Sequence, residues 1–150
     1  SVAAASLATV FAVGASSPAL ADPAGDNGTI KVDGVVFDTA PNNEPHVGCP
    51  FQVDFYGFDL GVGNATVTFV GQSPTGKSIF LLQDFVDIGQ DAAGGGTDLD
   101  AEVTYTLPVQ LLGDPHKVQG FHVKLTVNAP GSIGNDTKYK VFWVTDCNPY

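Results

Sequence analysis

Three carboxylates alternate with apolar residues just after a run of three glycines. Asp98, Asp100 and Glu102 are two positions apart, so an extended strand would direct them to one face. Carboxylate oxygens are the ligands that calcium prefers, and extracellular domains use weak calcium sites. The spacing is therefore compatible with a calcium site at these three residues. The plainer interpretation, which we favour, is a solvated acidic edge that discourages strand-to-strand aggregation.

A cluster of aromatic residues over 51–58 offers a second way to bind a ligand. Phe51 and Phe55 fall in the phase of the predicted core, which leaves Tyr56 and Phe58 toward the other face. Exposed rings on a β-sandwich can stack against sugars. Tyr56 and Phe58 are therefore the candidate ligand-binding residues, and the alternative is that they belong to the normal scatter of surface aromatics.

Residues 71–78, with the sequence GQSPTGKS, match the nucleotide-binding pattern G-x-x-x-x-G-K-[ST]. In a nucleotide-binding loop the backbone N–H groups surround phosphates, and the motif leads from a strand of a parallel sheet into a helix. The alternation on both sides of 71–78 is instead typical of antiparallel strands. We therefore interpret the match as a hairpin turn that contains Pro74 and Gly76.

The histidines and serines show no spacing typical of catalysis. His46, His116 and His122 form no H-x-H or H-x₃-H pair, which a zinc site would normally contain. No G-x-S-x-G elbow surrounds any serine. Paired carboxylates for glycoside hydrolysis stay open, because their separation depends on the fold. We predict no catalytic residues, no enzymatic activity, and no cofactor apart from the calcium considered above.

The elements that must position these residues are strands. Apolar and polar residues alternate with a period of two along most of the chain, which is typical of strands. The period of 3.6 that is typical of a helix is hard to find. Alternating runs between glycine-, proline- and asparagine-rich turns predict strands at 29–38, 50–56, 64–71, 77–86, 101–111, 118–128 and 138–145. About seven such strands predict an all-β fold, an immunoglobulin-like antiparallel β-sandwich. The run 79–88 would also suit a short helix.

The first 21 residues are typical of a secretory leader. They contain no charged or amide side chain, and residues 19–21 (ALA) provide a small-x-small cleavage site. A buried helix is the alternative, but it would lack a polar face. We predict a signal peptide over 1–21 that is truncated at its start, a flexible mature N-terminus over 22–28, and one β-sandwich domain over 29–150.

Secretion makes the two cysteines interpretable, because an oxidising compartment favours disulfides. Cys49 shares a phase with three predicted core residues, Phe51, Val53 and Phe55. Cys147 shares a phase with three more, Tyr139, Val141 and Trp143. Neither cysteine has the C-x-x-C spacing of a zinc or redox site. We therefore predict a Cys49–Cys147 disulfide with both sulfurs near the sheet interior.

The charge of the chain excludes two classes of partner. The 16 acidic and 6 basic side chains give a formal net charge of −10, and every basic residue is a lysine. Nucleic acids and anionic membrane surfaces are bound through clustered Lys and Arg, so neither is an expected partner. No apolar run reaches the roughly 18 residues that predict a spanning helix. We therefore expect no membrane insertion of the mature chain.

Five segments are distinctive, namely DNGTIKV at 26–32, NEPHVGCPF at 43–51, FYGFD at 55–59, QGFHVKL at 119–125 and KYKVFWVTDC at 138–147. Together they resemble a family of small secreted actinobacterial proteins. The resemblance implies a β-sandwich exported to the cell envelope, which in some members is followed by a sortase anchor. It implies no catalytic residues, because no activity is attached to the family.

These observations predict a secreted or cell-wall-associated, non-catalytic protein with a structural, adhesive or ligand-binding role at the cell surface. The alternative is an extracellular module that binds carbohydrate or calcium, through Tyr56 or the carboxylates of 98–102. An extracellular hydrolase is the third hypothesis. The expected partners are a cell-wall polymer, a carbohydrate or another surface protein.

Overall fold

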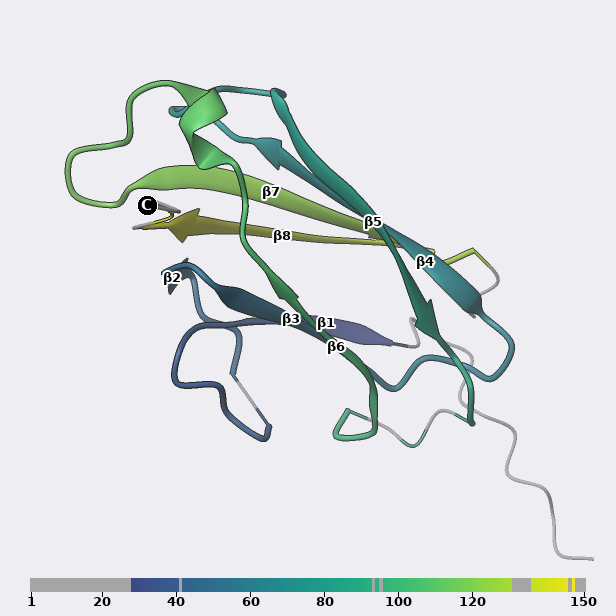
Figure 1. Cartoon of the computed structure of the whole chain (residues 1–150). Helices are drawn as coiled ribbons and strands as arrows, with labels where there is room; N and C mark the ends of the chain where they lie inside the picture. Colours follow the sequence, from purple (N-terminus) through teal and green to yellow (C-terminus); the bar gives the residue numbers. More distant parts are fainter. Residues whose placement is uncertain are drawn as a thin grey trace, which may run out of the picture.

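Two β-sheets pack face to face and form the two layers visible in Figure 1. The computed structural model describes residues 28–40, 42–92, 94, 96–130, 136–145 and 147. The smaller sheet has the strand order β1-β3-β6, and the larger has the order β2-β8-β7-β4-β5. The strands are β1 (Thr29–Asp33), β2 (His46–Val47), β3 (Phe51–Tyr56), β4 (Gly63–Gly71), β5 (Phe80–Ile88), β6 (Leu99–Tyr105), β7 (Phe121–Asn128) and β8 (Thr137–Val144).

The prediction of an all-β sandwich is confirmed, and the elements differ from it in detail. The short strand β2 carries no sequence signal, and it pairs in parallel with β8, so the larger sheet is not wholly antiparallel. The run 79–88 belongs to strand β5 rather than to a helix. The predicted strand 101–111 is β6 followed by a short 3₁₀ helix, Val109–Leu112. Pro108 precedes that helix and has no backbone N–H to donate to a strand ladder.

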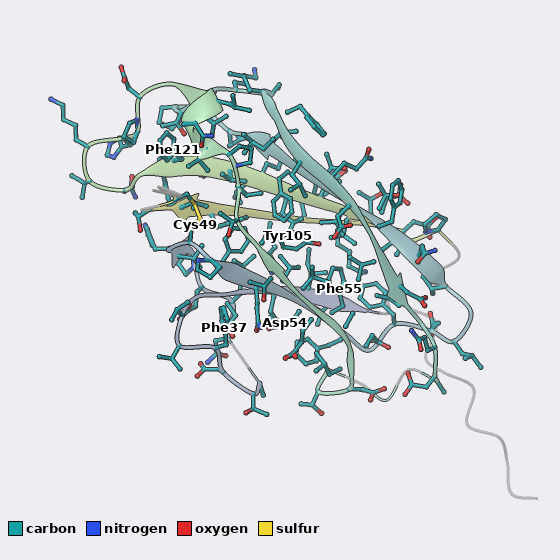
Figure 2. The ribbon with its side chains drawn as sticks, viewed as in Figure 1. Phe37, Cys49, Asp54, Phe55, Tyr105 and Phe121 are labelled. Atoms are coloured by element: carbon teal, nitrogen blue, oxygen red, sulfur yellow. A yellow bond between two sulfur atoms is a disulfide. The ribbon has the colours of Figure 1, made fainter. Side chains whose placement is uncertain are left out.

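The hydrophobic core lies between the layers and is centred on β3. Phe51, Val53 and Phe55 are fully buried, as their alternation predicts. The ring of Phe51 packs edge-to-face against Phe142 of β8 and Phe69 of β4, with centroid separations of 5.3 and 5.9 Å. Figure 2 shows Phe55 between the two layers. These contacts hold the smaller sheet against the larger one.

The predicted orientation of β8 is wrong. Tyr139 and Val141 are exposed, whereas Phe142 and Val144 face the core. Apolar residues occupy both phases of this strand, so its own alternation is ambiguous. The neighbouring strand decides the orientation, because the buried Val123 of β7 lies opposite Phe142 in the register.

The Cys49–Cys147 disulfide is confirmed. It joins the segment before β3 to the segment after β8, with a Cα–Cα distance of 4.8 Å. Cys147 is buried although the predicted phase of β8 was wrong, because it follows the end of the strand and need not obey its alternation. Cys49 follows β2 and Cys147 follows β8, so the disulfide joins these two paired strands just beyond their ends, where the chain leaves the larger sheet for β3.

The predicted signal peptide over 1–21 lies outside the described residues, as does the predicted flexible segment 22–28 except for Gly28. Within the described part of the chain, no helix has the length and apolar character needed to cross a membrane.

Candidate functional site

The three carboxylates considered for calcium do not form one site. A register shift opposite the start of β6 interrupts the alternation on which that hypothesis depended. Asp98 accepts a hydrogen bond from the backbone N–H of Gly94, and Asp100 accepts one from the backbone N–H of Phe58, each at 2.9 Å. Glu102 lies opposite Asp54 on β3. Among the described residues, no group of three or more Asp, Glu, His or Cys side chains is placed to hold a metal ion.

The expectation that Tyr56 and Phe58 face solvent is wrong. Their exposed fractions are 3% and 0%. Gly57 has a positive φ of 67°, which turns the chain after β3 and returns Phe58 to the core. The ring of Phe58 lies there with its centroid 6.2 Å from that of Phe55. Neither ring is available to stack against a ligand.

The outer side of the smaller sheet contains buried carboxyl groups. Asp54 has an exposed fraction of 0%, and neither of its carboxyl oxygens has a hydrogen-bond partner. Burial, the adjacent Glu102 and then Asp33 raise the pKa of Asp54 to about 7. Burial also raises the pKa of Asp33, although the backbone N–H of Asp38 donates a hydrogen bond to it and opposes that rise. Figure 2 shows Asp54 on the side of the sheet where Phe37 lies.

The segment 71–78 forms the turn of the hairpin between β4 and β5, as its antiparallel context predicts. The backbone N–H of Ser78 donates to the carbonyl oxygen of Gly71 at 2.8 Å. The backbone N–H of Thr75 donates to the carbonyl of Gln72 at 3.1 Å. These N–H groups close the turn, so they are not arranged around a phosphate.

The outer side of the larger sheet carries a set of exposed aromatic, hydroxyl and histidine side chains. The sequence did not predict that these side chains share one surface. The registers of the five strands place its residues in rows that run across the sheet. We call this surface the open sheet face, and its residues are His46, Thr137, Tyr139, Val141, Trp143, His122, Lys124, Thr126, Asn128, Asn64, Thr66, Thr68, Val70, Phe80, Gln83, Phe85 and Asp87.

Four apolar side chains of the open sheet face are more than half exposed. They are Tyr139 and Val141 on β8, and Phe80 and Phe85 on β5. In the row that begins at Tyr139, the next residues are Thr126, Thr68 and Gln83. Aromatic rings at both sides of the face therefore enclose hydroxyl and amide groups.

One end of the open sheet face brings together residues that are remote in sequence. The ring of His122 stacks on the single tryptophan, Trp143, with centroids 4.2 Å apart and an interplanar angle of 13°. The ring of His116 lies 5.6 Å from the same indole, and His46 occupies the neighbouring position on β2. His46 and His122 meet at Trp143 because β2, β8 and β7 are adjacent, and the loop before β7, closed by the bridge of His116 to Gly120, adds the third histidine.

The charge on the open sheet face differs from that of the whole chain. Its residues include one lysine, Lys124, and one aspartate, Asp87, so its formal charges cancel, although the chain has a formal net charge of −10. The ammonium of Lys124 lies 4.5 Å from the centroid of the Tyr139 ring, within the range of a cation–π contact. The buried and partly buried carboxylates Asp33, Asp54 and Asp100 belong to the smaller sheet.

Comparisons of the chain with family models, with curated proteins and with solved structures find no match.

Proposed function

We propose that this chain is a non-catalytic protein of the extracellular space or the cell wall, and that it binds a surface polymer through the open sheet face. The observation that carries the proposal is the group of exposed side chains Tyr139, Val141, Phe80 and Phe85 on a single sheet surface. They stand in two groups, on β8 and on β5, and exposed apolar groups gathered on one surface of a domain are typical of an interaction site.

The disulfide supports the proposed location. Such bonds form and persist in oxidising compartments, which include the extracellular space. The Cys49–Cys147 bond joins segments 98 positions apart in the chain, which suits a domain that must stay folded outside the cell.

The histidine contacts support a non-catalytic role. The Nδ1 atom of His122 lies 2.7 Å from the carbonyl oxygen of Ser73, which makes it a donor to the backbone. The Nδ1 atom of His116 accepts the backbone N–H of Gln119 at 3.2 Å. The Nδ1 atom of each of these two rings is therefore held by the main chain, and neither contact involves the serine hydroxyl or the carboxylate that a catalytic histidine would engage.

Co-sedimentation with isolated, insoluble cell walls tests the proposed function. The wild-type protein should pellet with the walls, and the double variant Tyr139→Ala/Phe85→Ala should stay in the supernatant. Leu111→Ala is the matched control, because Leu111 is an exposed apolar residue outside the open sheet face. Equal pelleting of all three proteins would contradict the assignment of binding to this face.

A screen against glycoside, peptide and ester substrates tests the absence of catalysis. The proposal expects no turnover. Turnover that disappears on replacement of His46 or His122 would overturn it.

A further inference from the structure

The composition of the open sheet face selects a class of ligand, and we infer that this face binds an uncharged polysaccharide laid across the strands. The inference rests on the proposed function and narrows it from a surface polymer to one chemical type. It is carried by three properties of the face, namely its rings, its hydroxyl rows and its charge.

The rings are placed to contact an extended ligand at two separate points. Tyr139 is on β8 and Phe85 is on β5, and two strands lie between them in the sheet order. Three strand spacings of roughly 4.8 Å put them about 14 Å apart across the sheet. Both rings are more than half exposed, so each can receive the apolar face of a sugar ring.

Hydroxyl and amide groups fill the space between the two rings. Thr126 and Thr68 are partly exposed and directly opposite each other on β7 and β4. Gln83 continues the same row on β5, and Asn128 lies in the next row. These groups both donate and accept hydrogen bonds, which matches the hydroxyl groups of a sugar chain. A purely apolar partner would leave them unsatisfied at a cost of about 1–3 kcal/mol for each group.

Charge complementarity argues for an uncharged ligand. A formal net charge of −10 repels a polyanion from the molecule as a whole. A polycation would be attracted to the carboxylates of the smaller sheet, such as Glu102 and Asp100, instead of to Lys124. On the open sheet face the formal charges of Lys124 and Asp87 cancel, so this face offers no net charge to attract either kind of charged polymer.

Isothermal titration calorimetry of the mature protein with a panel of soluble polysaccharides tests this inference. The neutral probes are a β-glucan, a mannan, a xylan and an arabinogalactan, and the charged probes are polygalacturonate and polylysine. We expect binding of at least one neutral probe, with an affinity that does not change between low and high salt. Binding of a charged probe alone would overturn the inference.

Two kinds of variant connect the binding to the face. Tyr139→Ala and Phe85→Ala should each weaken the affinity for the neutral probe about tenfold, and Leu111→Ala should leave it unchanged. Thr126→Val keeps the shape of the side chain and removes its hydroxyl, so it should also weaken binding of a polysaccharide. If Thr126→Val strengthens binding or has no effect, the ligand is apolar and the inference is wrong.

Three further outcomes separate the inference from the proposed function. If pelleting with walls still depends on Tyr139 and Phe85 but no neutral polysaccharide binds, the inference falls and the proposed function stands. If neither the pelleting with walls nor the binding of polysaccharide depends on these residues, both the inference and the proposed function are wrong. A concentration-dependent dimer in analytical ultracentrifugation that Tyr139→Ala abolishes would show that a second copy of the chain covers the face, which also overturns the inference.

Discussion

The imidazole of His122 lies parallel to the indole of Trp143, with ring centroids 4.2 Å apart and planes inclined by 13°. The two residues are directly opposite each other on β7 and β8. The backbone N–H of His122 also donates to the hydroxyl of Thr75, which holds the β4–β5 turn beside the stacked pair. The stack therefore joins three elements at one end of the open sheet face.

Replacement of His122 by alanine should uncover the indole. We expect His122→Ala to increase quenching of the single-tryptophan fluorescence by acrylamide, and to lower the free energy of unfolding by about 1 kcal/mol, which is typical of a lost ring contact. His46→Ala is the control, because His46 is adjacent to Trp143 in the register but is exposed. Equal quenching in the two variants would show that the stack does not shield the indole.

The buried carboxyl of Asp54 should make stability depend on pH. In the folded state its pKa is raised to about 7, whereas an unfolded carboxyl titrates near the usual value of about 4. Between these values the folded state holds a proton that the unfolded state has lost. The free energy of unfolding should therefore fall as the pH rises from about 4 to about 7, and then level off, with a total contribution on the order of 4 kcal/mol.

Asp54→Asn isolates this contribution, because the amide stays neutral at every pH. Urea unfolding should show a variant that is more stable than the wild type above pH 7, with a difference that shrinks toward pH 4. The difference between the two proteins cancels the contribution of Asp100, whose pKa burial also raises. Asp114→Asn in an exposed loop should leave the pH profile unchanged. A variant less stable than the wild type at pH 8 would contradict the prediction.

Loss of the disulfide should destabilise the fold strongly. Cys49 and Cys147 are 98 positions apart, so the bond restricts a long loop of the unfolded chain. On the chain-entropy model we expect the double variant Cys49→Ser/Cys147→Ser to lose about 4–5 kcal/mol in urea unfolding. A thiol assay on the unreduced wild-type protein checks the bond directly. Two titratable thiols would contradict it.

Gly71 at the end of β4 should not accept a side chain. A Cβ atom there would overlap the carbonyl oxygen of Gly76, because the two glycines approach closely inside the β4–β5 turn. We expect Gly71→Ala to lower the thermal midpoint, with a cost of about 2 kcal/mol or more. Gly96→Ala is the matched control, since no atom lies within 4 Å of its added Cβ. Similar midpoints for both variants would show that the turn tolerates the methyl group.

The sequence predicted the strands whose two faces differ clearly. Along β7, Val123, Leu125 and Val127 are buried, while His122 and Lys124 lie on the outer side, as the alternation indicated. The same method failed at β8, where both phases are apolar. It failed again at Phe58, because the turn at Gly57 ends the alternation, and at Tyr56, which is buried although it does not belong to the core between the sheets.

The candidate site could not be predicted from local sequence patterns. Tyr139, Thr126, Thr68 and Gln83 come from four strands and form one row only after the strands pair in a specific register. The gathering of three histidines at Trp143 likewise depends on the adjacency of β2, β8 and β7 and on the loop that carries His116 before β7. Nothing in the spacing of these residues along the chain indicates that they meet.

The sequence by itself determined the all-β class, the hairpin at 71–78 and the pairing of the two cysteines. These properties follow from period-two alternation, from turn residues and from a count of two thiols, and all of them are local or compositional. Only the tertiary structure decided which face of β8 is buried, that Asp54 is enclosed and that the open sheet face exists. Register and layer packing join residues far apart in the chain, so their outcome depends on every strand at once.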